Sequence, residues 1–360
     1  MLKASHGMKG YLDEMLRQFD PSGTGSLENA KRYLKSLDED WKSTGLTLAA
    51  NTEYGPYTLA KHLFLYEYLR PFFSIGGLKF RRLVYIDMFA GPGINAINDD
   101  GRAFITPGSP LISYLYTFRT KDKTRVDRFD SYYFYEASAR KAKILQDRLD
   151  RLRADFKLAE EARVIPRDSQ DDVWKTMEGE INSLKKPKKT EHRNDRGILF
   201  LLFIDPEGLG LKFDLLLKFL KRYVATADGE DTAHYFTADV IYTAPTHWSK
   251  QSGYASNLEL YCGISPTRQY SDEEVASLMG KRIREEVGGK CFVNSIPVRN
   301  SKNALQYHII SATKSQGAAN GAESLIKPLG LRARDLQSAL ESLMGDASTI
   351  DDFWVGQEKQ

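Results

Sequence analysis

Short apolar segments recur along the chain, and each is separated from the next by a stretch in which apolar residues repeat at helical spacing. These short segments are 83–86, 131–135, 162–166, 198–204 and 239–243. Their length and their content of β-branched and aromatic residues predict buried strands. The segment 198–204 is apolar throughout, which suits a central strand that is covered on both faces. Strands that alternate with helices in this way predict a mostly parallel α/β sheet.

The stretches around these strands predict helices. In 57–73, apolar residues recur at helical spacing from Leu59 to Phe73. The other predicted helices are 107–118, 138–160, 171–183, 213–223, 271–287 and 318–344. Near the C-terminus, 291–298 and 304–313 flank a turn and predict an antiparallel hairpin. The expected fold is therefore a doubly wound, mostly parallel α/β sheet with a C-terminal antiparallel hairpin.

The pattern also predicts how the chain is divided. Residues 1–55 are polar with a helical tendency, and we expect a helical N-terminal extension there. Residues 56–345 contain the predicted sheet, with an insertion at about 246–290 that is irregular and rich in aromatic residues over much of its length. Residues 346–360 are expected to form a frayed tail.

Composition narrows the class of protein. No apolar run approaches the length of a membrane span, and the N-terminus lacks the apolar core of a signal peptide. The two cysteines, Cys262 and Cys291, stand in unrelated contexts, so we expect no metal site, no disulfide framework and a cytoplasmic location. The formal net charge of +3 is too small to indicate nucleic-acid binding by itself.

A glycine turn follows the first predicted strand. Asp87 ends the strand, and Gly91 and Gly93 then allow positive φ angles and a close approach of a ligand to the backbone. The turn lacks the third glycine of a dinucleotide fingerprint and the Gly-Lys-Ser/Thr of a P-loop, which argues against dinucleotides and nucleoside triphosphates. The alternative is an ordinary tight loop. The residues we expect to contact a ligand here are Asp87, Phe89, Ala90, Gly91 and Gly93.

Acidic residues follow three further strands. Glu136 ends the second strand, where a nucleoside-binding sheet places a carboxylate for the ribose hydroxyls, and Asp168 follows the third. Asp205 follows the fourth. Carboxyl ends of parallel strands meet at one edge, and carboxylates that converge there need hydrogen-bond donors or a cation. For Glu136 and Asp168, the alternative is a side chain that faces water.

S-adenosylmethionine supplies the donors that such an edge needs, because it carries ribose hydroxyls, an exocyclic amine and an ammonium group. We expect Glu136 to bind the ribose and Asp168 to accept a hydrogen bond from the adenine amine. Five strand–helix units followed by a hairpin is also the order of a class I methyltransferase sheet, a likeness at the level of the fold. The predicted cofactor is therefore S-adenosylmethionine.

The sequence also resembles the three-Cys-motif partner proteins over about residues 55–315. The similar segments are 58–62 (Thr-Leu-Ala-Lys-His), 85–93 (Tyr-Ile-Asp-Met-Phe-Ala-Gly-Pro-Gly), 108–111 (Gly-Ser-Pro-Leu), 134–136 (Phe-Tyr-Glu) and 203–209 (Phe-Ile-Asp-Pro-Glu-Gly-Leu). The resemblance implies a methyltransferase fold and a partner protein with three cysteines that resembles radical S-adenosylmethionine proteins. The chain departs from the family at Glu207, where members usually have an aromatic or bulky residue.

The run Asp205-Pro206-Glu207 contains the candidate catalytic residues. Methyltransferases that act on the amines of flipped bases have Asp/Asn-Pro-Pro-Tyr/Phe after the fourth strand, where the polar side chain and a proline carbonyl accept hydrogen bonds from the amine. Here no aromatic residue follows, so stacking would have to come from elsewhere. Glu207 could act as a base or lie on a solvated loop. The candidate substrate-binding residues are Lys61, His62, His247 and Trp248.

Two hypotheses of different classes follow. The first is a methyltransferase that acts on nucleic acid or a modified nucleotide. The second is a non-catalytic subunit with this fold that binds or scaffolds a partner, which the missing aromatic residue favours. A nuclease on a similar sheet would need a carboxylate cluster with a lysine at metal-binding spacing, and the sequence contains no clear one.

Overall fold

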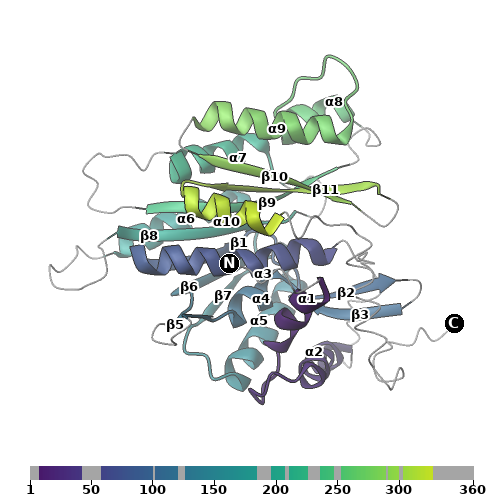
Figure 1. Cartoon of the computed structure of the whole chain (residues 1–360), viewed down its shortest axis with the longest axis vertical. Coiled ribbons are helices and arrows are strands. Elements are labelled where there is room, and N and C mark those ends of the chain that lie inside the picture. Colours follow the sequence, from purple (N-terminus) through teal and green to yellow (C-terminus); the bar gives the residue numbers. More distant parts are fainter. Residues whose placement is uncertain are drawn as a thin grey trace.

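The computed structural model describes residues 8–42, 58–99, 102–120, 126–184, 196–206, 211–225, 236–246, 253–288, 291–299 and 303–326. The predicted tail at 346–360 lies outside these ranges, as does most of the predicted helix 318–344. The described helices pack on both sides of a central sheet (Figure 1).

The helices and strands have the following bounds. The helices are α1 (Met8–Arg17), α2 (Leu27–Lys42), α3 (Thr58–Lys79), α4 (Ser109–Leu115), α5 (Ala139–Asp155), α6 (Ser169–Ser183), α7 (Phe213–Phe219) with η1 (Leu220–Ala225), α8 (Tyr254–Asn257) with η3 (Leu258–Cys262), α9 (Asp272–Val287) and α10 (Gln316–Ile326). The strands are β1 (Phe80–Asp87), β2 (Ile94–Asp99), β3 (Arg102–Pro107), β4 (Phe118–Arg119), β5 (Val126–Asp127), β6 (Ser131–Tyr135), β7 (Ala162–Ile165), β8 (Arg196–Ile204), β9 (Phe236–Pro245), β10 (Phe292–Arg299) and β11 (Leu305–Thr313).

Seven strands form the main sheet in the order β10-β11-β9-β8-β1-β6-β7. Strands β1, β6, β7, β8 and β9 run parallel to one another, whereas β11 is antiparallel to both β9 and β10. This is the strand order of a class I methyltransferase sheet, and the fold class predicted from the sequence is confirmed. The order reverses between β1 and β8, which places the topological switch point at their carboxyl ends.

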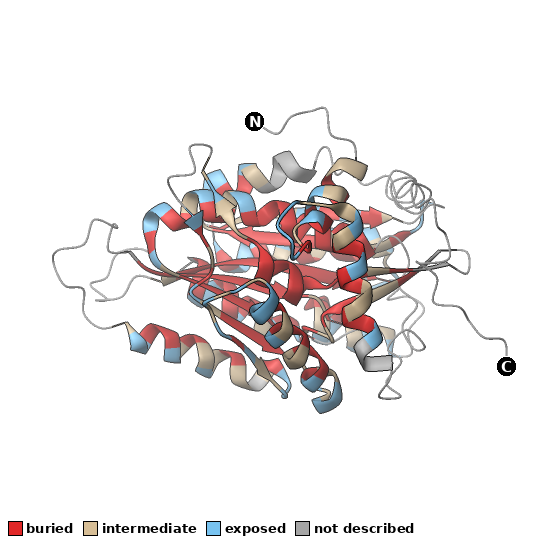
Figure 2. Cartoon of the chain, turned by 90° about the horizontal axis from the view of Figure 1, so that it is seen from below, coloured by how far each residue is buried: buried red, intermediate tan, exposed pale blue. Residues whose placement is uncertain are grey.

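The two faces of the sheet belong to two apolar cores. Successive residues of β1, such as Tyr85 and Ile86, point to opposite faces of the sheet. One core contains α1 to α5, and the other contains α6, α7 with η1, and α9. The sheet is buried between helices that expose only their outer sides (Figure 2). Because both faces are covered, β8 is apolar and buried along Ile198–Ile204.

The helices α1 and α2 lie beside α3 and the hairpin β2–β3 (Figure 1). Arg148 of α5 connects α2 to the glycine turn: its guanidinium donates to the carbonyls of Leu37 at 3.1 Å and Pro92 at 2.8 Å. Arg148 is almost completely buried and lies 3.5 Å from the carboxylate of Asp38. Helix α2 therefore supports the turn that follows β1.

The loop between α1 and α2 is organised by Asp20. This carboxylate accepts hydrogen bonds from the hydroxyls of Ser22 at 2.6 Å and Thr24 at 2.8 Å. Hydrogen bonds from Ser22, above all, hold the pKa of Asp20 below its usual value. Asp20, Ser22, Thr24 and Gly25 (φ 71°) match the first, third, fifth and sixth positions of an EF-hand loop. Lys31 stands at the twelfth position, where calcium loops have a bidentate glutamate, and hydrogen bonds to Asp20 close this loop.

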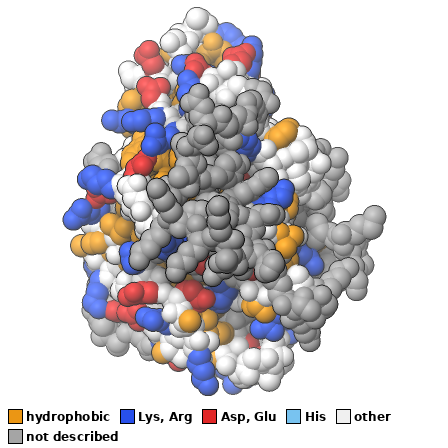
Figure 3. Space-filling model, turned by 90° about the vertical axis from the view of Figure 1, so that its left-hand side faces the viewer, with side chains coloured by type: hydrophobic (Ala, Val, Ile, Leu, Met, Phe, Trp, Pro, Cys, Tyr) orange, Lys and Arg blue, Asp and Glu red, His pale blue; other side chains and the backbone are white. Residues whose placement is uncertain are grey.

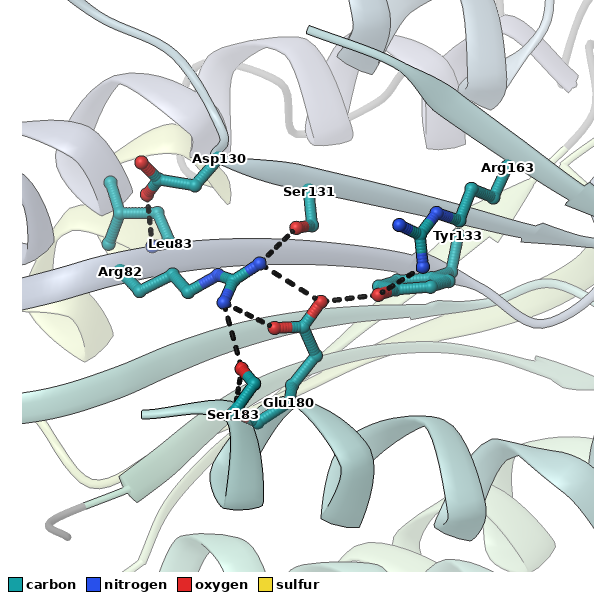
Figure 4. A network of polar contacts seen from close by, with 8 residues as sticks. All are labelled: Arg82, Leu83, Asp130, Ser131, Tyr133, Arg163, Glu180 and Ser183. Carbon is teal, nitrogen blue, oxygen red and sulfur yellow. Dashed lines mark hydrogen bonds and ion pairs between the residues drawn. The ribbon is translucent and has the colours of Figure 1, made fainter. Parts of the chain in front are cut away.

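A polar network fixes α6 to the amino ends of β1 and β6 (Figure 4). Arg82 forms an ion pair with the buried Glu180 at 3.0 Å and donates to the hydroxyl of Ser131 at 2.9 Å. The hydroxyl of Tyr133 also donates to Glu180. The network anchors the C-terminal part of α6, so the opposite end of the helix, which begins after Asp168, has a fixed position at the carboxyl edge of the sheet.

The hairpin β2–β3 was not predicted from the sequence. It follows the glycine turn and projects from the right-hand side of the sheet in Figure 1. Its residues are mixed in polarity, with Asn95, Asn98 and Asp99 in one strand, so apolar periodicity does not reveal it. Together with α4, it lies in the chain between the glycine turn and Glu136.

The surface has no strong bias of charge on the face shown in Figure 3. Lysine and arginine side chains are interspersed there with aspartate and glutamate side chains. The described residues include exposed ion pairs, such as Lys221 with Glu286 and Arg222 with Glu178. None of the helices within the described ranges has the length and apolar character needed to cross a bilayer.

Candidate functional site

A cavity of about 300 Å³ opens at the carboxyl ends of β1, β8 and β9. It lies at the topological switch point, the position at which open α/β sheets bind ligands. The glycine turn forms one wall, Asp205 and Pro206 form a second, and the first turn of α3 closes a third. The strand ends converge because β1 lies directly between β8 and β6 in the sheet.

The glycine turn has the backbone conformation that its sequence predicted. Gly91 and Gly93 have φ angles of 61° and 84°, in the left-handed region that favours glycine. A Cβ atom on Gly93 would lie 2.4 Å from Leu111 and 2.8 Å from Leu145, whereas a Cβ atom on Gly91 would meet nothing within 4 Å. Gly93 is therefore required for packing, and Gly91 presents open backbone to the cavity.

Asp87 lies buried beneath the turn. Its carboxylate accepts hydrogen bonds from the backbone N–H of Phe89 at 3.2 Å and the hydroxyl of Tyr85 at 3.4 Å. Burial raises the pKa of Asp87 to about 7, and the negative charge of Asp205 acts in the same direction. Hydrogen bonds from Ser109, Phe89 and Tyr85 oppose the shift. A cationic ligand at the turn would favour the ionised form of Asp87.

The raised pKa of Asp87 predicts a dependence of stability on pH. The usual pKa of an aspartate is about 3.9, so the contribution of Asp87 to stability is complete below about pH 4 and is lost as the pH rises to about 7. In Asp87→Asn, the free energy of unfolding should fall less steeply across this window, by up to about 1 kcal/mol per pH unit. Denaturant unfolding at several pH values measures the difference.

Asp168→Asn, a change at an exposed carboxylate, is the matched control for this experiment and should behave as wild type. Glu67 and Asp239 also have pKa values raised by burial, to about 7 and about 6. They contribute to the wild-type curve, but they are unchanged in both variants. Identical slopes in Asp87→Asn and wild type would show that Asp87 does not titrate in this range.

Lys61 and Asp205 form an ion pair inside the cavity. Lys61 comes from the first turn of α3, and Asp205 directly follows β8. Their side chains are only 15% and 14% exposed, so water screens the pair much less than it screens surface pairs. The sequence predicted both residues for this site but did not predict their contact.

His62 lines the same cavity and is almost completely buried. Burial, followed by the positive charge of Lys61, lowers its pKa well below the usual value, so the ring is neutral near pH 7. Its Nδ1 atom has no hydrogen-bond partner within the described ranges. The Nδ1 atom is itself shielded from solvent, so a ligand in the cavity meets other atoms of the His62 ring unless the side chain moves.

Glu136 and Asp168 follow β6 and β7 at the same edge of the sheet, but neither lines this cavity. Glu136 accepts a hydrogen bond from the backbone N–H of Ser138 at 2.8 Å through one oxygen. Asp168 is exposed and is the N-cap of α6, where it accepts from the N–H of Gln170 at 3.0 Å. Asp168 therefore has a structural role besides the predicted one.

Several residues of the cavity were not among the candidate site residues, although Thr58 and Ser109 stand in segments that carry the family resemblance. They are Thr58, Asn95, Ser109, Thr243, Thr246, Gln306 and Tyr307. Thr246 donates a hydrogen bond to the carbonyl of Gln306, which joins the end of β9 to β11. The antiparallel pairing of β11 with β9 brings Thr243, Thr246, Gln306 and Tyr307 to the carboxyl edge, and only a prediction of the strand order could have indicated these four residues.

Three predicted site residues, Glu207, His247 and Trp248, lie outside the described residues. The described members of the predicted site that line the cavity are Lys61, His62, Phe89, Ala90, Gly91, Gly93, Asp205 and Pro206. No group of three or more His, Cys, Asp or Glu side chains in the described part of the chain is arranged to hold a metal ion.

No family model and no curated protein matches the chain. Among solved structures, the chain is similar to protein LPL1258 of Legionella pneumophila str. Philadelphia 1, of family model DUF519, with a TM-score of 0.41, 13% identity and coverage of 75% of this chain and 92% of the other. It is also similar to the methyltransferase domain of bacterial CtHen1-C, with a TM-score of 0.29, 13% identity and coverage of 65% and 89%. The assignment of the fold rests on strand order and direction.

Proposed function

We propose that the chain is an S-adenosylmethionine-dependent methyltransferase whose substrate is an amine of nucleic acid or of a modified nucleotide. The observation that supports this proposal most directly is the single cavity shared by the glycine turn and Asp205-Pro206. In a class I sheet these two elements belong to the cofactor and to the amine that accepts the methyl group, respectively. Their common cavity permits the in-line geometry that methyl transfer requires.

The residues at the turn fit the cofactor. The open space over Gly91 admits a ligand close to the backbone, and the buried Asp87 can compensate a positive charge. In this proposal Phe89, Ala90 and Gly93 complete the cofactor wall, Glu136 accepts from the ribose hydroxyls, and Asp168 accepts from the adenine amine. When bound, S-adenosylmethionine supplies a methyl group on a sulfonium.

The chain's own residues would then position the substrate. Asp205 and the carbonyl of Pro206 accept hydrogen bonds from the target amine, which orients its lone pair toward the methyl group. Lys61 holds Asp205 until the substrate arrives. His62, whose ring is neutral, forms part of the cavity wall on the substrate side. Glu207, His247 and Trp248 are proposed to complete the substrate side, with Glu207 as a candidate base.

A second function is favoured by the ion pair at Asp205. Lys61 already satisfies the carboxylate that would accept the target amine. In a methyltransferase-like subunit without transfer activity, the ion pair between Lys61 and Asp205 would stay formed at all times. Such a subunit would bind or scaffold a partner. The resemblance to three-Cys-motif partner proteins suggests a three-cysteine, radical S-adenosylmethionine-like protein as that partner. A transfer assay with and without this type of protein separates the two functions.

Cofactor binding provides the first test. Glu136→Ala should weaken the binding of S-adenosylmethionine by about 1–3 kcal/mol, the cost of losing hydrogen bonds to a charged group. Isothermal titration calorimetry with S-adenosylmethionine and S-adenosylhomocysteine, at protein concentrations of about 100 μM suited to micromolar affinity, measures the change. Glu161→Ala, at an exposed glutamate before β7, is the matched control. Absence of binding heat with both ligands would contradict the proposal.

A further inference from the structure

We propose that Lys61 is itself a methyl acceptor, so that the chain modifies its own active site. This inference rests on the proposed function. The side chain of Lys61 projects into the cavity from α3, and its ammonium contacts the carboxylate of Asp205. An amine of the substrate would have to contact the same carboxylate. Lys61 therefore places a primary amine at the position of the methyl acceptor.

The position of Lys61 is fixed by the helix that carries it. Most residues of α3 are buried, including Leu59, Ala60 and Leu63 around Lys61. The Lys61 side chain is 15% exposed, so it is held in the cavity. Among the described residues that line the cavity, Lys61 is the one lysine or arginine. A methyl group delivered between the glycine turn and Pro206 would thus meet one lysine amine in this part of the chain.

The chemical step balances with a methyl sulfonium as donor. The Lys61 ammonium first gives a proton to the carboxylate of Asp205, which passes it to water. The neutral amine then attacks the methyl carbon; the N–C bond forms as the S–C bond breaks, and the electron pair goes to sulfur as the thioether leaves. Since the ammonium must lose its proton before it can attack, the rate should rise with pH.

Methylation would change what Lys61 does at the site. Each methyl group replaces one N–H donor, and a fully methylated ammonium keeps its charge but cannot donate a hydrogen bond to Asp205. The pair between Lys61 and Asp205 is then weakened, and the carboxylate becomes accessible to an amine of the substrate. Self-modification would in this way convert the paired site into one that accepts substrate.

The test uses the full chain with S-adenosylmethionine that carries a deuterated methyl group. Peptide mass spectrometry should find deuterated methyl on Lys61 and not on Lys79, an exposed lysine at the other end of α3. The fraction modified per unit time should not change over a tenfold range of protein concentration, because the reaction is intramolecular. Asp205→Asn should slow it about 100-fold. Protein purified without added donor should already contain some methylated Lys61.

Calorimetry on the same samples separates the two proposals. Binding of S-adenosylmethionine without methyl on Lys61 would overturn self-methylation and leave the proposed function intact, whereas absence of binding would overturn both. Equal labelling of Lys61 and Lys79 would show unspecific chemistry and would also overturn self-methylation. Lys61→Arg keeps a cation beside Asp205 and should bind the donor within about threefold of wild type, a difference of less than 1 kcal/mol, without forming methyl-lysine at this position.

Discussion

Replacing Gly93 by alanine should destabilise the chain by about 2–5 kcal/mol. The left-handed backbone at φ 84° costs an alanine about 1–2 kcal/mol. The new methyl group would also lie 2.4 Å from Leu111 and 2.8 Å from Leu145, and overpacking of this kind costs about 1–3 kcal/mol. The side chains of Leu111 in α4 and Leu145 in α5 must shift to make room for the methyl group. Denaturant unfolding followed by circular dichroism measures the loss.

Gly91→Ala is the matched control for Gly93→Ala. It has the same left-handed conformation, with φ 61°, but open space where its Cβ would lie. We expect only the conformational cost of about 1–2 kcal/mol, together with weaker cofactor binding because the methyl group faces the ligand. Equal stability of the two variants would contradict the prediction that Leu111 and Leu145 leave no room for a methyl group at Gly93.

The sheet could be predicted because its strands are short, apolar and bounded by sharp signals. The segment 198–204 indicated a central strand, and β8 lies in the interior of the sheet as a result of the same burial on both faces. The turn at Gly91 and Gly93 was predictable because its glycines are needed by the backbone itself. Features set by local sequence were therefore accessible without the structure.

Features that depend on the packing of distant segments could not be predicted from the sequence. The contact between Lys61 and Asp205 joins two segments far apart in the sequence, and neither residue indicates its partner. The same holds for the link from Arg148 to Pro92. The role of α2 in supporting the turn could not be expected from its polar sequence, because the connection passes through a backbone carbonyl at Leu37.

The sequence indicated which polar residues could bind a ligand better than it indicated the contacts that these residues make. Asp168 was expected to bind adenine, and the structure shows it capping α6, a role that also suits an aspartate before a helix. The loop around Asp20 was predicted only as part of the helical N-terminal extension. Its Asp-x-Ser-x-Thr-Gly spacing was visible in the sequence, and a search for calcium loops with a replaced twelfth residue would have found it.

Asp205→Ala should abolish methyl transfer while the affinity for the cofactor changes by less than about threefold. In the proposed function, Asp205 acts on the amine that is methylated and not on the sulfonium, so its loss should appear in the rate of transfer, by a factor of about 100 or more. Single-turnover methyl transfer to oligonucleotide or nucleotide amines measures the rate, and calorimetry measures the affinity. A stable variant with an unchanged rate of transfer would contradict the catalytic role of Asp205.

The ion pair between Lys61 and Asp205 determines which control the Asp205→Ala experiment needs. Asp205→Ala leaves the largely buried Lys61 without its carboxylate, so the variant should lose stability as well as activity. The alternative role of Asp205, in which it only caps the following turn, also predicts a loss of stability. The double variant Lys61→Met, Asp205→Ala removes both charges and should recover most of the melting temperature. If transfer remains absent in this stable double variant, at least one of the two side chains is needed for chemistry; if transfer returns, Lys61 and Asp205 have only a structural role.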